Sequence, residues 1–242
     1  MKVTRILAAL TLVAGFAGVA HAQNGCARLS WGAANCATWT ENQAYTGPAV
    51  YTLSYSMFGV SASNVGHDSQ LRIRHLSGPP PSSAVPDSWR FDDSGCQTAS
   101  QLALNETGSK TCPAMKGANS LAITQYAIDV DGSAFLRLAV TYDTFSPVAA
   151  TRYVAWNVLF DHTFSSVGPT PPDNSTCGGA ELCENFSLDF AQILASTGTA
   201  IPLPGCDTDP SLPGVLATWN GGCAQPVATT PATWGKLKGM YH

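Results

Sequence analysis

The sequence predicts an all-β protein, an antiparallel β-sandwich stapled by disulfide bonds, and three observations lead to this fold class. Apolar and polar residues alternate with a period of two in several short segments, as they do in strands that bury one face. Glycine and proline, 22 and 16 of the 242 residues, gather between these segments, where turns need them. The eight cysteines are an even number behind an export signal, which is typical of a disulfide framework formed in an oxidising compartment.

The N-terminus, residues 1–22, has the features of a secretory signal peptide. Lys2 and Arg5 precede an apolar stretch over residues 6–20, and the small residues of Ala20-His21-Ala22 fit a cleavage site. No later apolar run approaches the ~20 residues that a membrane-spanning helix needs. We therefore expect a soluble mature chain that is secreted to the periplasm or the cell exterior.

The strands follow in order along the mature chain. Residues 51–57 alternate tyrosine, leucine or methionine with threonine or serine, which predicts a half-buried strand. Residues 71–74 show the same pattern, with Leu71 and Ile73 against two arginines. Residues 152–164 are apolar on both faces, which predicts a central strand covered on each side. Shorter strands are expected over residues 186–190, 200–203 and 215–219.

A hairpin is predicted between residues 121–130 and residues 133–142. Asp131-Gly132 joins the two arms and suits the positive φ angles of a tight turn. The apolar residues of the first arm change parity midway along the strand. This change predicts a β-bulge near residues 124–125.

A single sandwich domain over residues 23–223 accounts for these strands, and the C-terminus is expected to be separate from it. Residues 224–233 are rich in proline, threonine and alanine and are expected to form a linker. Residues 234–242 are expected to form an amphipathic tail with a short helix. The apolar side chains that would share one face of this helix are Trp234, Leu237 and Tyr241.

The cysteines are all expected to form structural disulfides. Many pairings are possible for eight cysteines, but their spacing falls into four local couples separated by longer stretches. A zinc or redox role is not expected, because no Cys-x-x-Cys is present and no histidine stands at ligand spacing from a cysteine. The four couples are Cys26 with Cys36, Cys96 with Cys112, Cys177 with Cys183, and Cys206 with Cys223.

The charge balance argues against nucleic acid and anionic membranes as partners. The chain has 12 basic and 16 acidic residues, and Lys2 and Arg5 would leave with the signal peptide. Affinity for nucleic acid comes mainly from neutralising phosphates with lysine and arginine. No basic run is present that would hold an anionic membrane surface. No cofactor is expected either.

Motifs for catalysis or metal binding are weak. Asp161 and His162 end the longest strand, but neighbouring strand residues point to opposite faces, so a core histidine is expected. Residues 92–95 (Asp-Asp-Ser-Gly) resemble the nucleophile turn of serine proteases, yet no matching histidine motif accompanies them. The loops at residues 129–133 and 207–209 each hold two aspartates and are expected to be turns, with calcium ligation as the alternative.

Six tryptophans raise the alternative of a sugar-stacking platform. Trp156 continues the buried face of the longest strand and is expected in the core. Trp31, Trp39 and Trp89 are the candidate ligand-binding aromatics, because aromatic rings on a β surface can stack on a ligand. For Trp31 and Trp39, packing on a nearby disulfide is the other interpretation.

Two resemblances add to these predictions. Residues 70–74 (Gln-Leu-Arg-Ile-Arg) are followed by residues 86–91 (Pro-Asp-Ser-Trp-Arg-Phe), a hairpin and a long hydrophobic strand. This order resembles that of cohesin-like extracellular sandwiches over about half of the mature chain. The resemblance implies an immunoglobulin-like or cohesin-like sandwich, and it transfers no binding residue.

The second resemblance covers nearly the whole mature chain. Residues 86–91 with Gly95-Cys96, and residues 160–164, 176–179 and 233–236, are similar to segments of uncharacterised exported proteins from environmental bacteria. This resemblance implies a secreted bacterial protein and brings no activity with it.

The predicted function is that of a secreted binding or structural module that acts through loops on a rigid, disulfide-braced scaffold. Its expected partner is a carbohydrate or another extracellular protein. A secreted polysaccharide hydrolase is one alternative, because paired carboxylates converge in space rather than in sequence. A cell-surface adhesion protein, attached through the tail, is the other. No catalytic, cofactor-binding or metal-binding residue is assigned.

Overall fold

The computed structural model describes residues 25–32, 40–76, 84–109, 112–148, 150–206 and 215–223. The predicted signal peptide, linker and tail helix lie outside these residues. Within them the chain forms short 3₁₀ turns, η1 (Asp87–Trp89) and η2 (Ala99–Gln101), and a series of strands. The strands are β1 (Cys26–Trp31), β2 (Asn42–Gln43), β3 (Val50–Phe58), β4 (Asn64–Arg74), β5 (Leu102–Asn105), β6 (Leu121–Ile128), β7 (Ala134–Phe145), β8 (Arg152–Asp161), β9 (Glu184–Ala195), β10 (Ala200–Pro202) and β11 (Val215–Trp219).

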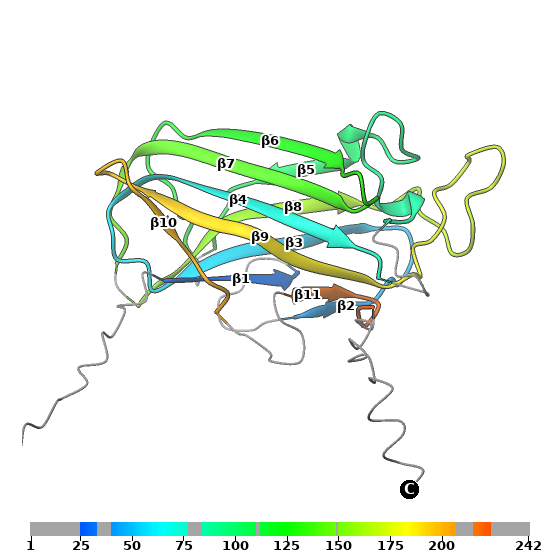
Figure 1. Cartoon of the computed structure of the whole chain (residues 1–242), viewed down its shortest axis with the longest axis horizontal. Helices are drawn as coiled ribbons and strands as arrows, with labels where there is room; N and C mark the ends of the chain where they lie inside the picture. Colours follow the sequence, from blue (N-terminus) through cyan, green and yellow to red (C-terminus); the bar gives the residue numbers. More distant parts are fainter. Residues whose placement is uncertain are drawn as a thin grey trace, which may run out of the picture.

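The strands form two sheets that pack as a sandwich, which confirms the predicted fold class. The smaller sheet has the order β1-β3-β8-β5, and the larger has the order β2-β11-β9-β4-β7-β6, with β10 paired to β9. The pairs are antiparallel, except that β11 runs parallel to β2. Strands β6, β7, β4 and β9 lie side by side in the larger sheet (Figure 1).

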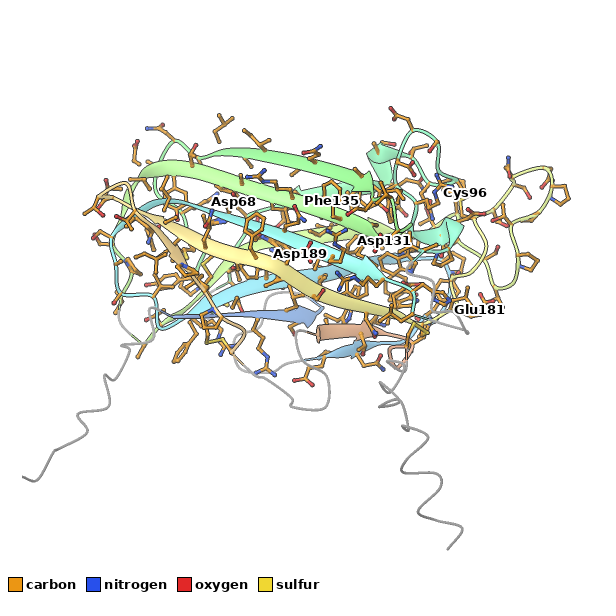
Figure 2. All side chains as sticks on the ribbon, in the orientation of Figure 1. Asp68, Cys96, Asp131, Phe135, Glu181 and Asp189 are labelled. Atoms are coloured by element: carbon orange, nitrogen blue, oxygen red, sulfur yellow. A yellow bond between two sulfur atoms is a disulfide. The ribbon has the colours of Figure 1, made fainter. Side chains whose placement is uncertain are left out.

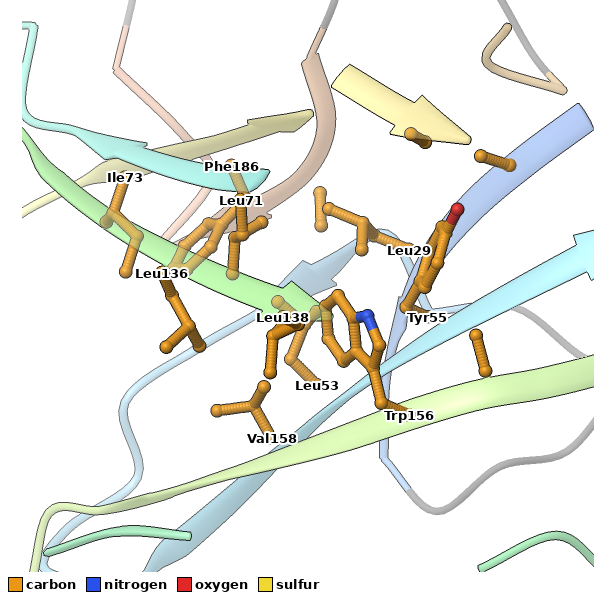
Figure 3. Packing of buried hydrophobic residues seen from close by; sticks show 14 of the residues in the cluster. Leu29, Leu53, Tyr55, Leu71, Ile73, Leu136, Leu138, Trp156, Val158 and Phe186 are labelled. Carbon is orange, nitrogen blue, oxygen red and sulfur yellow. The ribbon is translucent and has the colours of Figure 1, made fainter. Parts of the chain in front are cut away.

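The core lies between the two sheets, where the alternating residues meet (Figure 3). Leu53 and Trp156 come from the smaller sheet, and Leu71 and Leu138 come from the larger one, all with 0% exposure. Fully burying a side chain of this size contributes about 1.5–3 kcal/mol. The apolar residues of the period-two pattern therefore form the buried face of their strands.

One end of the sandwich is filled by aromatic rings. The turn η1 carries Trp89 between the sheets, where its ring lies 5.0 Å from Phe160, 5.2 Å from Phe186 and 5.1 Å from Trp219. The angles between these ring planes are 67°, 68° and 88°, the edge-to-face arrangement that aromatic pairs favour.

The predicted hairpin forms, but its predicted bulge near residues 124–125 is wrong. β6 and β7 pair without a register shift from Leu121 opposite Thr141 to Ile128 opposite Ala134. The apolar pattern changes parity for another reason: Leu121 points out of the sandwich and is 64% exposed, whereas Ile128 packs against the core. At the turn, Gly132 adopts the positive φ of 80° that the sequence led us to expect.

Strand β8 is the predicted central strand, and it contains a bulge that the sequence did not reveal. β8 lies between β3 and β5 and is buried along most of its length. Trp156 pairs with Tyr55 while Val154 pairs with Ser56, so Ala155 is an extra residue. Tyr153 lies in the core cluster, whereas Val154 is buried outside it.

The predicted local cysteine couples are wrong. Three disulfides join described residues: Cys26–Cys206, Cys96–Cys177 and Cys183–Cys223, with Cα atoms 4.8, 5.5 and 5.0 Å apart. Cys112 is also disulfide-bonded, and Cys36 lies outside the described residues. The spacing of two cysteines in the sequence gives only the length of the loop that their bond would close. A disulfide forms between cysteines that the fold brings close together.

The Cys26–Cys206 bond illustrates the reason for this correction. The chain after β10 runs alongside β1, where Pro204 accepts a hydrogen bond from the Ala27 N–H at 2.7 Å. The Cys206 N–H donates in turn to the Ala27 carbonyl at 2.8 Å. Backbone pairing between segments far apart in sequence therefore decides which sulfur atoms meet.

Candidate functional site

The candidate ligand-binding tryptophans that can be placed are inside the protein. Trp31 is 3% exposed and Trp89 is 0% exposed, and their ring centroids lie 6.5 Å apart in the aromatic end of the core. The indole N–H of Trp31 donates to the Thr218 carbonyl at 2.8 Å. Trp39 lies outside the described residues. The faces of Trp31 and Trp89 are covered by protein, so they offer no stacking surface in this structure.

His162 is a core histidine, as predicted, and does not share a site with Asp161. It is 0% exposed, and its Nδ1 lies 2.8 Å from the Ser165 hydroxyl, which also accepts a hydrogen bond from Gln97 at 2.7 Å. Its ring stacks on Trp219 with centroids 5.4 Å apart. Burial lowers the pKa of His162 to about 3, so the imidazole is neutral.

A buried carboxyl group lies beside the Cys183–Cys223 disulfide. Glu184 is 0% exposed, and its Oε1 is 3.3 Å from His75 Nδ1. Burial raises the pKa of Glu184 to about 7, and hydrogen bonding with Glu184 raises the pKa of His75. His75, Cys183 and Cys223 bring possible ligand atoms within 4.8 Å of one another, but both sulfur atoms belong to one disulfide and offer no thiolate.

The outer surface of the larger sheet is a further candidate site. We call a group of outward-facing side chains at the centre of β4, β7 and β9 the front face. Figure 2 labels three of them, Asp68, Phe135 and Asp189. They alternate along the strands with core residues such as Leu71 and Leu138. The front face comprises Asp68, Gln70, Arg72, Phe135, Arg137, Ala139, Asp189 and Phe190.

Arg72 forms the first of two similar units on the front face. Its guanidinium bonds to Asp189 at 2.7 Å and to Asp129 at 2.7 Å, and its central carbon lies 5.6 Å from the centre of the Phe135 ring. The hydrogen bond from Arg72 lowers the pKa of Asp129. Two carboxylates therefore hold the guanidinium over the Phe135 ring. The charged hydrogen bonds and the cation–π contact both stabilise this arrangement.

Arg137 forms the second unit in the same way. Its guanidinium bonds to Asp68 at 2.9 Å and lies 5.7 Å from the centre of the Phe190 ring. The alternation in the sequence predicts that these arginines point outward. It gives no sign of the carboxylates and rings that meet them, because those partners come from other strands.

A cleft of about 630 Å³ lies where the sandwich is open between β5 and β6. Its polar lining is Arg90, Asp92, Asp93, Ser94 and Thr124, and its apolar lining includes Phe91, Leu102, Tyr126, Ile128 and Leu136. Asp92 accepts hydrogen bonds from Ser94 at 2.5 Å and from Arg90 at 3.3 Å. Partial burial alone would raise the pKa of Asp92, but these hydrogen bonds outweigh it and leave the pKa below its usual value.

The residues of the protease-like turn therefore line a pocket, but they form no nucleophile site there. The Ser94 hydroxyl donates to Asp92 and accepts from Arg90 at 2.9 Å, and the described part of the cleft lining contains no histidine. Among the described residues, Glu184 has a strongly raised carboxyl pKa, but it does not line the cleft. Among the same residues, no helix has the length and apolar character needed to cross a membrane.

Comparisons with known proteins give structural neighbours only. No family model and no curated protein matches the sequence. One similar solved structure is the cohesin module from the family 33 glycoside hydrolase of Clostridium perfringens ATCC13124. It is 11% identical, with a TM-score of 0.37 over 74% of this chain and 90% of that one.

Another neighbour is the second type II cohesin module from the cellulosomal adaptor ScaA scaffoldin of Acetivibrio cellulolyticus. It is 7% identical, with a TM-score of 0.35 over 73% of this chain and 88% of that module. A second structure of it, with a long C-terminal linker, is 9% identical with the same TM-score and covers 87% and 97%. These neighbours are of the sandwich type that the strand order resembled, and no binding residue is carried over from them.

Proposed function

We propose that this chain is a secreted binding module that holds another extracellular protein on its front face. The observation that carries the proposal is the pair of arginine-over-phenylalanine units, Arg72 with Phe135 and Arg137 with Phe190, on the outer side of three long strands. Arginine and aromatic residues supply a large share of the binding energy in protein interfaces. The disulfides support a location in an oxidising compartment.

The ion pairs prepare this surface for binding. Each guanidinium is already held by a carboxylate, so less side-chain freedom is lost when a partner arrives. Arg74 lies 3.8 Å from Asp189, and with it the two units hold three guanidinium groups and three carboxylates. This balance of charge favours a partner surface that is mainly neutral and supplies hydrogen bonds and apolar contacts. Residues 1–22 remain our proposed export signal, and the proposed domain remains residues 23–223.

The test is site-specific photo-crosslinking on the secreted chain. A photoreactive amino acid replaces Ala139, which faces outward from β7, and in a matched control it replaces Thr52, which faces outward from β3 in the smaller sheet. We expect one protein from the source culture to crosslink at position 139 and not at position 52. Crosslinking at position 52 alone, or at neither position, would overturn the proposal.

Variants of the front face then measure the contribution of the two units. With the captured partner purified, Arg137→Glu and Phe190→Ala are each expected to weaken binding at least about tenfold. Thr52→Glu is expected to leave the affinity unchanged, because it alters the charge of the other sheet. Equal effects of all three variants would show that binding does not depend on the front face.

A second candidate function is carbohydrate binding in the cleft. The specific observation in its favour is a lining that combines polar Arg90, Asp92 and Ser94 with Leu102 and Tyr126, a mixture that suits a hydroxylated ligand. A polysaccharide array with wild type and Asp92→Asn tests it, and binding that Asp92→Asn does not change would exclude the cleft. Release of reducing sugar in the same assay would instead favour the hydrolase.

A further inference from the structure

The first half of β6 is open on both faces and along one edge. β6 ends the order of the larger sheet, so β7 is its one neighbour there. Residues 118–125 are all exposed, and Leu121 and Ile123 are each 64% exposed. Among the described residues, no backbone hydrogen bond from outside the sheet reaches β6. The free edge therefore presents N–H and C=O groups that can pair with another strand.

This edge lacks the features that usually prevent strands from pairing between molecules. Natural edge strands are protected by charged side chains, prolines or bulges. β6 has the sequence Leu-Ala-Ile-Thr-Gln-Tyr-Ala-Ile, with no charged residue and no proline, and it pairs with β7 without a register shift. The exposed half of the strand is therefore well suited to extend the sheet into a second molecule.

The residues around Ala122 are chemically symmetric, and this symmetry identifies the second molecule. Ser120 and Thr124 carry hydroxyl groups, and Leu121 and Ile123 are aliphatic. When two such strands pair antiparallel about Ala122, Leu121 of one copy lies opposite Ile123 of the other. Ser120 lies opposite Thr124 in the same register. Aliphatic and hydroxyl pairs of this kind stabilise neighbouring strands, so the segment is complementary to itself.

We propose that two copies of this chain pair through β6 in an antiparallel register centred on Ala122, which joins their larger sheets. In this register, residues of equal parity lie opposite one another, so the outer surfaces of both sheets face the same side. The pair has two-fold symmetry, and each copy covers the exposed Leu121 and Ile123 of the other. The inference does not depend on the proposed function of the front face.

Sedimentation velocity of the full secreted chain over a range of concentrations is the first test. We expect a reversible monomer–dimer equilibrium. Ile123→Lys is expected to raise the dissociation constant of the dimer more than about tenfold, because two ammonium groups would enter the interface. Val167→Lys is the matched control, because Val167 is 67% exposed and lies outside β6, and it should dimerise like wild type.

A charge exchange tests the register itself. Leu121→Glu alone should also weaken the dimer, whereas an equimolar mixture of unlabelled Leu121→Glu and uniformly nitrogen-15-labelled Ile123→Lys should form a heterodimer. The isotope label gives the heterodimer a mass between those of the two homodimers, so native mass spectrometry can distinguish it. Only the register centred on Ala122 places position 121 opposite position 123. A monomeric wild type, a dimer that persists in Ile123→Lys, or variants that the mixture does not rescue would each overturn the proposal.

Misfolding is excluded by a separate measurement. Both substituted side chains are largely exposed, so near-ultraviolet circular dichroism and the thermal midpoint should match those of the wild-type monomer. Amide hydrogen exchange gives an independent readout, because the free edge of β6 should exchange more slowly as the protein concentration rises. Exchange that does not change with concentration would contradict pairing through β6.

Discussion

Trp156 and Ser69 join the two sheets through a buried hydrogen bond, in which the indole Nε1–H donates to the serine Oγ at 3.0 Å. Both residues are 0% exposed. Ser69→Ala would leave the indole N–H without its acceptor, and we expect the free energy of unfolding to fall by about 1–3 kcal/mol. Guanidinium denaturation measures this change. Ser196→Ala, at an exposed position, is the control and should change the stability by less than about 0.5 kcal/mol.

Glu184 and His75 should make the stability depend on pH. Burial raises the pKa of Glu184 from 4.5 to about 7, so between these values the folded protein keeps a proton that the unfolded chain releases. The free energy of unfolding therefore falls as the pH rises through this window. His75 acts in the same direction, because Glu184 raises its pKa above 6.5 in the folded state. Glu184→Gln should remove a difference of about 3 kcal/mol across the window.

The readout for this pH effect is the difference between wild type and variant. Burial lowers the pKa of His67 to about 4 and that of His162 to about 3, so the unfolded chain takes up these protons first as the pH falls below 6.5. Their contribution to stability is lost towards acid, opposite in sign to that of Glu184. Unfolding curves at several pH values for wild type and Glu184→Gln separate the two effects. Parallel pH profiles would contradict the assignment.

Peptide mapping without reduction should recover Cys26 linked to Cys206, Cys96 linked to Cys177, and Cys183 linked to Cys223. Replacing both Cys26 and Cys206 with serine should lower the free energy of unfolding by about 2–5 kcal/mol, because the cross-link spans 180 residues and limits the unfolded chain. Recovery of peptides that link neighbouring cysteines would refute this connectivity.

The two arginine units of the front face should differ in their effect on stability. The side chain of Arg72 is 12% exposed and that of Asp189 is 24% exposed, whereas the side chain of Arg137 is 50% exposed. Water screens an exposed ion pair more strongly. We expect Arg72→Gln to cost about 1–2 kcal/mol and Arg137→Gln less than about 1 kcal/mol. Urea denaturation measures the loss of stability in each variant, and a larger loss for Arg137→Gln than for Arg72→Gln would contradict this prediction.

The sequence predicted the strands, and with them the fold class, at the positions where a local pattern of apolar residues determines the structure. The alternation in residues 51–57 and 71–74, and the continuous apolar run of β8, correspond to strands in the predicted positions. The bulge at Ala155 was missed because an extra residue on one strand is defined by its partner strand. The cysteine pairs were wrong for the same reason, since β1 meets the chain after β10 only once the sheets form.

The candidate sites were less accessible to sequence reasoning than the fold. Trp31 and Trp89 were candidates because aromatic rings on a β surface can stack on a ligand, but the aromatic end of the core encloses both. Arg72 and Arg137 were visible only as polar positions of strands. Their roles depend on Asp189 and Phe190 of β9, which lie far along the chain and become neighbours through the pairing of β4 with β9 and β7.

The bond between Cys26 and Cys206 also determines how the domain would respond to mechanical tension. A pulling force applied outside Cys26 and Cys223 passes through the sulfur atoms to Cys206 and then along the short stretch to Cys223. The Cys183–Cys223 bond adds a second route between Cys206 and Cys223 through residues 183–206, and the long segment over residues 27–182 is bypassed. Force can therefore separate the two ends of the domain very little, which suits a component that must stay assembled under tension.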